Sequence, residues 1–236
     1  MTYEKRFDGR DFDETRETKV EIGIIPRADG SAKFTFGNTK AIATIYGPRL
    51  LHPQHHQDPE KAKLRCNYDM LSFSVSERKK PGPSRRSTEV SHVIENALSS
   101  VVQLESFPGT AVDLEIEVIQ ADASTRCAGI NAASLALAHA GIPMTDLISS
   151  VSVGCIGNKI CIDLRKEEED YEEDDEKMAT DIPMAFSTRT GKMTLLQLDG
   201  KIKPKMLKEA IDAGFKACLK INEIQKKALR ALKLKE

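Results

Sequence analysis

One short corner of the chain, at residues 121–134, combines residue types that bind anions. The stretch ADASTRCAGINAAS joins an alternating apolar and charged run, typical of a β-strand, to small residues typical of a close-packed helix. A helix N-terminus presents free N–H groups and attracts phosphate. Ser124 and Thr125 add hydroxyl donors, and Arg126 adds a guanidinium that fits phosphate oxygens. This corner is a candidate phosphate site, and a plain helix cap beside a surface arginine is the alternative.

Two further places carry groups that suit phosphate chemistry. Arg85 and Arg86, in PSRRS, stand at an expected helix start, and paired arginines can hold a polyphosphate backbone. Asp181, in TDIPMAF, stands at the mouth of an apolar strand, where an acid can be a general acid or a metal ligand. The alternatives are a solvated basic loop and a turn aspartate, and Asp163 in CIDL has the same ambiguity. Together these groups fit attack by or on phosphate, which depends mostly on positioning and charge stabilisation.

The elements that would position these groups follow from hydrophobic periodicity. Strand-like runs with turn signals occupy much of the first third, and an apolar stripe from Val90 to Val101 predicts a helix capped by Ser87 or Thr88. Two hairpins and a long helix from about residue 204 complete the chain. Because several strands precede each helical block, the order favours an α+β fold. The predicted first-half elements are strands at 19–26, 31–37, 40–48, 66–76 and 111–119, and helices at 87–104 and up to 140.

Composition narrows the class of protein. The chain has 236 residues, which suits one large domain or two small ones, and a net charge of −1, so any nucleic-acid surface must be local. Five scattered cysteines without CxxC spacing predict reduced thiols and, with no leader or membrane-length apolar run, a cytoplasmic protein with no membrane partner. The run at 167–176 holds nine carboxylates in ten residues, which predicts a solvated loop for most of them.

Beyond these local patterns, nearly the whole chain resembles the RNase PH superfamily, and within it the catalytic ring subunits of archaeal exosomes. The run at 120–144 is the most specific part of the resemblance. It implies a single RNase PH-like domain over 1–236, with halves of about 1–145 and 146–236, in which mixed sheets pack against helices in β-α-β-α order. The matching stretches are RFDGRDFDETR, YGPRLLHPQH, PSRRSTEVSHVIENAL, QADASTRCAGINAASLALAHAGIPM and TDIPMAF.

The resemblance implies a processive 3′→5′ exoribonuclease that acts by phosphorolysis and is reversible to 3′ tailing. It assigns inorganic phosphate to Ser124, Thr125 and Arg126, although the commoner loop has glycine where this chain has Ser124. It assigns the catalytic acid to Asp181. By the same resemblance a second acid falls on Asp175, with Asp174 or Asp170 as alternatives because the acidic loop is longer here, and the two acids are candidate ligands for Mg²⁺ or Mn²⁺. The residues implied to bind the RNA backbone are Arg85, Arg86 and, at the narrow opening of a ring, Arg65.

The resemblance also implies partners. These are single-stranded RNA, a homologous inactive ring subunit in a hetero-hexamer with three copies of each, and RNA-binding cap proteins. Two alternatives stay open at this stage. One is a stand-alone enzyme of the RNase PH type that trims tRNA 3′ ends, and the other is a non-catalytic ring subunit that only binds RNA.

Overall fold

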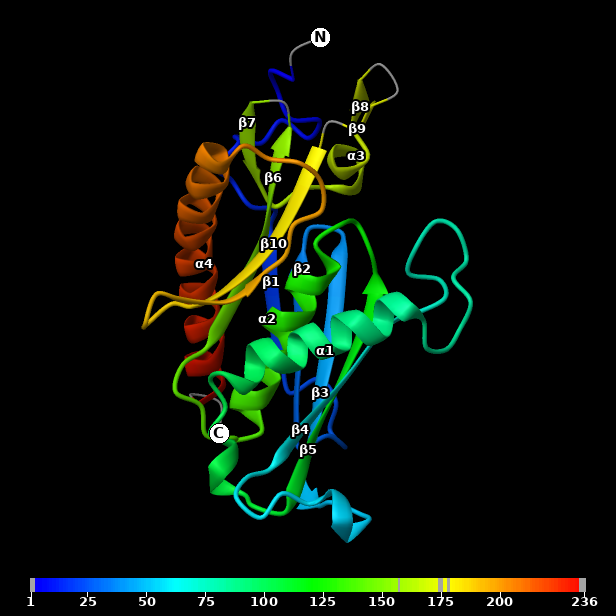
Figure 1. Cartoon of the computed structure of the whole chain (residues 1–236), viewed down its shortest axis with the longest axis vertical. Coiled ribbons are helices and arrows are strands. Elements are labelled where there is room, and N and C mark those ends of the chain that lie inside the picture. The colour runs from blue at the N-terminus through cyan, green and yellow to red at the C-terminus, as the bar shows by residue number, and fades with distance from the viewer. Residues whose placement is uncertain (1–2, 157, 174–175, 178, 234–236) are drawn as a thin grey trace.

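The chain folds into two β-sheets with a helix packed between them (Figure 1). The computed structural model describes residues 3–156, 158–173, 176–177 and 179–233. Sheets and helices alternate in layers, so the predicted α+β class is confirmed. Within the described ranges, no helix is both long enough and apolar enough to cross a bilayer. Four of the five cysteines are buried, and Cys66 is partly buried.

The first sheet is mixed and has the order β1-β2-β3-β5-β4. Its pairs are antiparallel except for β4 and β5, which run parallel because the chain crosses over through a helix between them. In β3 buried and partly exposed residues alternate from Thr39 to Gly47, as expected for a sheet with one face on the core. The strands are β1 (Thr18–Ile22), β2 (Gly30–Phe36), β3 (Thr39–Leu50), β4 (Lys63–Met70) and β5 (Thr110–Gln120).

The second sheet is antiparallel throughout and has the order β11-β10-β6-β7. Every residue of its central strand β6 is buried, because helices cover this sheet on both faces. Its strands are β6 (Ile148–Ile156), β7 (Lys159–Ile162), β10 (Ala179–Ser187) and β11 (Lys192–Leu196). A separate small hairpin pairs β8 (Glu172–Glu173) with β9 (Glu176–Lys177).

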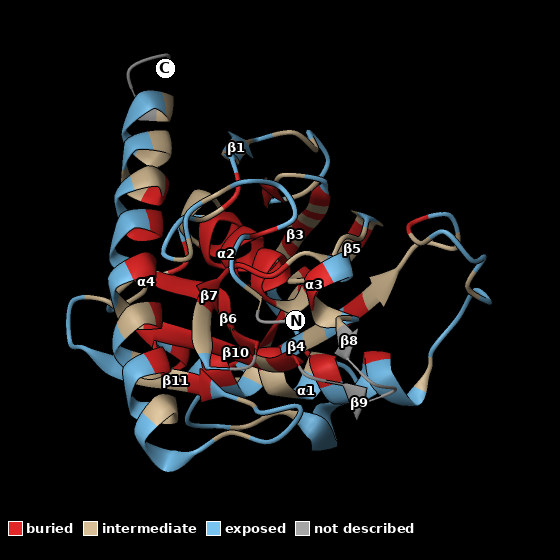
Figure 2. Cartoon of the chain, turned by 90° about the horizontal axis from the view of Figure 1, so that it is seen from above, coloured by how far each residue is buried: buried red, intermediate tan, exposed pale blue. Residues whose placement is uncertain are grey.

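The helix α2 (Thr125–His139) lies at the centre of the molecule and contacts both sheets (Figure 2). Of its 15 residues only Arg126, Ala138 and His139 are not buried. A Cβ on Gly30 would lie 2.3 Å from the carbonyl oxygen of Ala136, so glycine is what lets β2 approach this helix. The other helices are α1 (Arg85–Ser99), α3 (Lys166–Glu169) and α4 (Pro204–Lys233), with 3₁₀ turns at Gln54–His56 and Leu104–Ser106.

Three predicted elements in the first half have different bounds in the structure. The strand expected at 19–26 is β1, which ends at Ile22. The strand expected at 66–76 is β4, which begins at Lys63 and ends at Met70, so residues 71–76 form turns. The first helix begins at Arg85, capped by Ser84 rather than by Ser87 or Thr88, because Ser84 and Ser87 exchange side-chain to backbone hydrogen bonds of 2.8 and 3.0 Å. It ends at Ser99, so Val101 is buried beyond the helix rather than on it.

The acidic run departs from the prediction of a solvated loop. Its first residues form α3, and the side chain of Glu168 is fully buried. Glu168 binds Arg6 in an ion pair with an N–O distance of 2.7 Å and accepts a 2.7 Å hydrogen bond from the hydroxyl of Tyr3. The prediction was wrong at this position because the compensating charges come from the N-terminal segment, more than 160 residues away in the sequence.

Candidate active site

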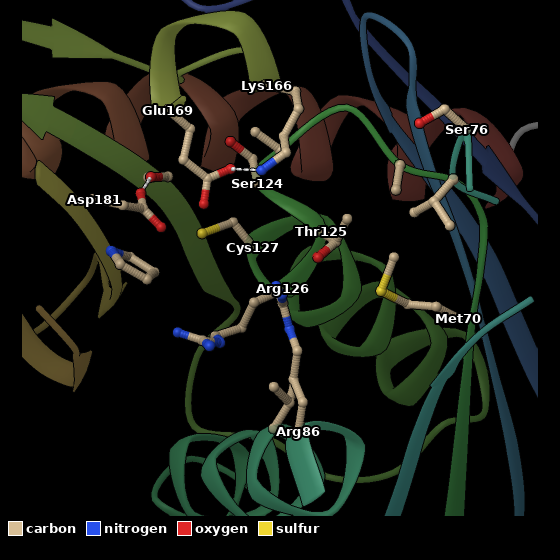
Figure 3. A pocket seen from close by; sticks show the side chains of 16 residues that line it. Met70, Ser76, Arg86, Ser124, Thr125, Arg126, Cys127, Lys166, Glu169 and Asp181 are labelled. Atoms are coloured by element: carbon tan, nitrogen blue, oxygen red, sulfur yellow. Dashed lines mark hydrogen bonds and ion pairs between the residues drawn. The ribbon is translucent and has the colours of Figure 1, made fainter. Parts of the chain in front are cut away.

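A pocket opens where the N-terminus of α2 meets the second sheet and the first turn of α1 (Figure 3). Arg86 and Arg126 lie on one side of it and Asp181, Glu169 and Lys166 on the other, and segments far apart in the sequence contribute them. The polar residues that line it are Ser76, Arg86, Ser124, Thr125, Arg126, Ser152, Lys166, Glu169 and Asp181.

The corner before α2 has an unusual backbone. Ser124 is the N-cap residue and has left-handed dihedral angles, with φ 53° and ψ 22°, and Ala123 before it also has a positive φ of 55°. The Ser124 side chain makes no capping hydrogen bond to the helix, so the N–H groups of the first turn are left for another acceptor. The hydroxyl instead donates to Oδ1 of Asp163 over 3.0 Å. The predicted helix start is confirmed, and the corner offers backbone donors to the pocket.

Thr125 and Arg126 follow directly in the first turn of α2. Thr125 is buried. Burial of Tyr68 raises the pKa of its phenol, and the hydrogen bond between Tyr68 and Thr125 partly opposes this shift. The guanidinium of Arg126 extends into the pocket, and its Nε is buried without a hydrogen-bond partner. A buried donor without an acceptor costs free energy, about 1–3 kcal/mol, which an anion in the pocket would recover.

Arg86 approaches the same space from the first turn of α1. It lines the pocket together with Arg126, so two guanidinium groups face the volume in front of α2. Paired arginines next to a helix N-terminus make a site for a phosphate group or for two phosphates in sequence.

Asp181 lies on β10 on the opposite side of the pocket. Its carboxylate accepts a hydrogen bond from the hydroxyl of Ser152 on the neighbouring strand β6. Burial raises its pKa, the hydrogen bond from Ser152 opposes this shift, and the nearby charge of Glu169 raises the pKa further. The net direction is upward, which favours a protonated carboxyl group that can act as an acid.

Comparisons with known proteins place the chain in a family. A sequence model described as the 3′ exoribonuclease family, domain 1, matches residues 14–143, and the model of domain 2 of that family matches residues 146–217. The chain belongs to the 3′ exoribonuclease family. Relatives of this exoribonuclease chain include the exosome complex component Rrp41 of Thermococcus kodakarensis, which is 47% identical over 98% of this chain and 90% of its own length. The Methanopyrus kandleri protein of the same name is 45% identical over 95% and 92%.

Solved structures confirm the fold of this family member. Rice Rrp46 superposes with a TM-score of 0.83 at 23% identity, over 95% of this chain and 100% of the rice chain. A chain from the Archaeoglobus fulgidus exosome with RNA bound to the active site gives a TM-score of 0.78 at 22% identity, over 93% and 92%. The RNase PH-like architecture expected from the sequence is therefore confirmed.

The structure of this exoribonuclease chain brings most predicted site residues together, but not all. Arg85 is exposed and does not line the pocket. Arg65 lies on β4, away from the pocket, and forms a two-pronged ion pair with Asp113, with N–O distances of 2.5 and 2.7 Å. Five residues further along the same strand Met70 lines the pocket, which puts Arg65 about 17 Å away along the strand.

The second predicted acid, Asp175, and its alternative Asp174 lie outside the described residues. The other alternative, Asp170, is exposed and accepts a hydrogen bond of 2.7 Å from Lys166. Among the residues that the structure describes, no group of three or more histidine, cysteine or carboxylate side chains is arranged to hold a metal ion. A metal site built on Asp181 and Asp175 stays a prediction.

Sequence reasoning missed four polar residues of the pocket, which are Ser76, Ser152, Lys166 and Glu169. Lys166 and Glu169 reach it from α3, where they form an ion pair with an N–O distance of 3.6 Å, and Ser152 reaches it from β6. Lys166 and Glu169 belong to a charge-rich stretch whose pattern indicates only exposure. Ser152 belongs to a strand in which every residue is buried, so an alternation of apolar and polar residues could not indicate which side chains face the pocket.

Proposed function

We propose that this chain is the catalytic subunit of an exosome ring and that it shortens RNA from its 3′ end by phosphorolysis. One observation supports this most directly. The unpartnered Nε of Arg126 and the uncapped start of α2 share one pocket with Asp181, whose pKa is raised. Attack by phosphate on a phosphodiester needs an anion site beside a group that can protonate the leaving oxygen, and a carboxyl group with a raised pKa suits the second role. Relatives named as exosome components support the biological setting.

The proposed reaction exchanges one P–O bond for another. An oxygen of inorganic phosphate attacks the phosphorus of the last phosphodiester bond, and the bond from phosphorus to the 3′ oxygen of the preceding nucleotide breaks. Asp181 gives its proton to that leaving oxygen, and the proton of hydrogen phosphate restores the balance. The products are a nucleoside diphosphate and an RNA shortened by one nucleotide. Because the bonds exchanged are alike, the ratio of phosphate to diphosphate sets the direction, and excess diphosphate extends the RNA.

The proposed roles of the cations follow from their positions. The N–H groups at the start of α2, with Arg126, hold inorganic phosphate, and Arg86 holds the terminal phosphodiester. Arg85 and Arg65 lie outside the pocket, so we assign them to phosphates further along the strand. Contacts of this kind are to the backbone and carry little sequence preference.

In the alternative role, an ionised Asp181 would hold a divalent ion, Mg²⁺ or Mn²⁺, together with Asp175. When bound, it would supply additional positive charge near the transferring phosphorus. The described residues alone make no three-ligand cluster, and the steps above need only the chain's own groups.

The proposed assembly is a ring of six with three copies of this chain and three of a homologous inactive subunit, and RNA-binding cap proteins over one face. Five scattered cysteines without CxxC spacing agree with a reducing compartment, and we propose the cytoplasm.

The test mixes the chain and its ring partner with poly(A) labelled in every internucleotide phosphate, with and without phosphate. Nucleoside diphosphates should appear only with phosphate, and excess diphosphate without phosphate should lengthen the RNA. Arg126→Glu and Asp181→Asn should abolish both reactions. Arg189→Glu changes an exposed arginine in the turn that follows β10, outside the pocket lining, and serves as the control that keeps activity. Monophosphates formed without phosphate would show a hydrolase and overturn the proposal.

Size-exclusion chromatography tests the alternative of a stand-alone enzyme, and the activity of the variants tests the alternative of a subunit that only binds RNA. A stand-alone enzyme that trims tRNA would form a hexamer of this chain alone and be active without a partner. A subunit that only binds RNA would join the ring but show no change in activity when Asp181 or Arg126 is replaced.

A further inference from the structure

Asp163, at the end of β7, is a buried carboxylate that the reaction proposed above does not use. Its side chain has no exposed surface, and it does not line the pocket. Its partner is Arg16, which donates to it from the backbone N over 2.9 Å, from Nε over 2.9 Å and from Nη2 over 2.6 Å. A pair this well hydrogen-bonded fixes the position of the carboxylate within the core.

The same arginine also reaches the corner before α2. Nη1 of Arg16 donates to the carbonyl oxygen of Asp122 over 2.5 Å. The hydroxyl oxygen of Thr39 lies 2.9 Å from the carbonyl oxygen of Asp122 and 2.7 Å from that of Ala123, and it donates its one proton to one of them. The N-terminal segment and β3 therefore hold the backbone of this corner from one side.

Ser124 is held from the other side by Asp163. The hydroxyl of Ser124 donates to Oδ1 of Asp163 over 3.0 Å, and an alternative acceptor, the carbonyl oxygen of Leu164, is further away at 3.4 Å. A hydroxyl has one proton to donate, so in this arrangement the proton of Ser124 is engaged by the core and not by the pocket.

Backbone strain is concentrated at the same place. Among the described residues, the non-glycine residues with positive φ are Ala123, Ser124 and Asp163, at 55°, 53° and 55°. Side chains disfavour this conformation, and it persists only where surrounding contacts hold it. At Ser124 the holding contact is the hydrogen bond to Asp163, and the direction of the N–H groups that follow depends on it.

We propose that Asp163 is a positioning residue, which acts through Ser124 to hold the start of α2 in the conformation that binds phosphate. This inference rests on the proposed function. According to this inference, Ser124 contributes through its backbone conformation, and its hydroxyl does not contact phosphate directly.

Three substitutions at two positions test this in the assembled complex. Ser124→Ala keeps the Cβ and removes the hydrogen bond, so the loop relaxes, and the KM for phosphate should rise about tenfold. Ser124→Gly removes the hydrogen bond too, but glycine adopts positive φ freely, so the KM should rise only about two- to threefold. Asp163→Asn should behave like Ser124→Ala where it folds. The KM for RNA should stay unchanged in all three.

The matched control is Ser187→Ala. Ser187 is also buried, and its hydroxyl also donates to a carboxylate, Oδ2 of Asp146, over 2.7 Å, but it lies outside the pocket lining. Its substitution should leave the KM for phosphate unchanged.

The outcomes separate the inference from the function on which it rests. Equal rises in the KM for phosphate in Ser124→Ala and Ser124→Gly would mean that the hydroxyl contacts phosphate directly. No rise in either would mean that the loop does not need Asp163. Both results overturn the inference and leave phosphorolysis standing, whereas a wild-type complex that releases no diphosphate overturns the function and the inference with it.

Discussion

Arg6 and Glu168 form an ion pair in which neither side chain has any exposed surface, and it joins the N-terminal segment to α3. Nε and Nη2 of Arg6 each donate to a different oxygen of the carboxylate, over 2.8 and 2.7 Å. Arg6 also donates to the carbonyl oxygens of Ile162 and Asp163 over 2.7 and 2.9 Å. The N-terminal segment therefore supports the wall of the pocket from which Lys166 and Glu169 project.

Breaking this ion pair should destabilise the protein strongly. Glu168→Ala leaves the Arg6 guanidinium buried without its counter-charge, and we expect a loss of about 3–5 kcal/mol in the free energy of unfolding. Glu167→Ala is the matched control, because the side chain of Glu167 is exposed on the same helix, and it should cost less than about 0.5 kcal/mol. Urea denaturation of both variants measures the difference. Equal small losses would show that the ion pair contributes little.

The pH dependence of stability should reflect the same pair. Burial acts to raise the pKa of Glu168, but the hydrogen bonds from Arg6, Arg165 and Tyr3, together with the charge of Arg6, outweigh this, and the net direction is downward from 4.5. The folded state therefore binds fewer protons than the unfolded state below this value, and stability is lost as the pH falls through the lowered pKa. In melting curves from pH 6 to pH 2, Glu168→Gln should lower the melting temperature near neutrality and show a weaker dependence on acid. A parallel shift at every pH would contradict this.

The contribution of Asp181 to stability should change with pH in the opposite direction to that of Glu168. Its pKa is raised from 3.8, chiefly by burial, so the folded state binds more protons and stability falls as the pH rises through the raised pKa. We expect Asp181→Asn to melt at the same or a higher temperature than the wild type above that pH, while phosphorolysis falls about 10²- to 10⁴-fold. Paired melting and rate measurements at pH 4 and pH 8 test this. A large loss of stability at pH 8 would indicate a structural role for the carboxylate.

Arg65 should affect long RNA more than short RNA, because it lies along β4 outside the pocket. Arg65→Ala should weaken the binding of long RNA, reduce the slope of log K against log salt by about one, and leave a short RNA that only fills the pocket unaffected. Arg49→Ala is the matched control, since Arg49 is another exposed arginine paired with an aspartate on this sheet. Equal effects of Arg65→Ala on short and long RNA would place Arg65 at the scissile end.

Local patterns predicted those parts of the fold that depend on neighbours in the sequence. The start of α2 at Thr125 follows from the change of period at the corner, and the stripe from Val90 to Leu98 gives α1 its buried face. The end of α1 was placed too late because Val101 continues the stripe although the helix has stopped. Periodicity indicates which residues are buried, but it does not show whether a buried residue belongs to the helix or to the segment that follows it.

The missed parts of the site depend on contacts between distant segments. Glu168 and Asp163 are buried only because Arg6 and Arg16 reach them from the N-terminal segment, and no pattern within the acidic stretch indicates those partners. The backbone at Ser124 was also beyond sequence reasoning, because serine is not a residue type that favours positive φ.

The position of α2 has a consequence for motion. Core residues surround this helix on nearly every side, so its amides can exchange with solvent only when much of the molecule opens. Hydrogen exchange along its length should therefore be among the slowest in the chain, up to the turn that faces the pocket. A ligand held there is attached to the most rigid part of the protein, and its affinity should fall when core packing far from the pocket is loosened.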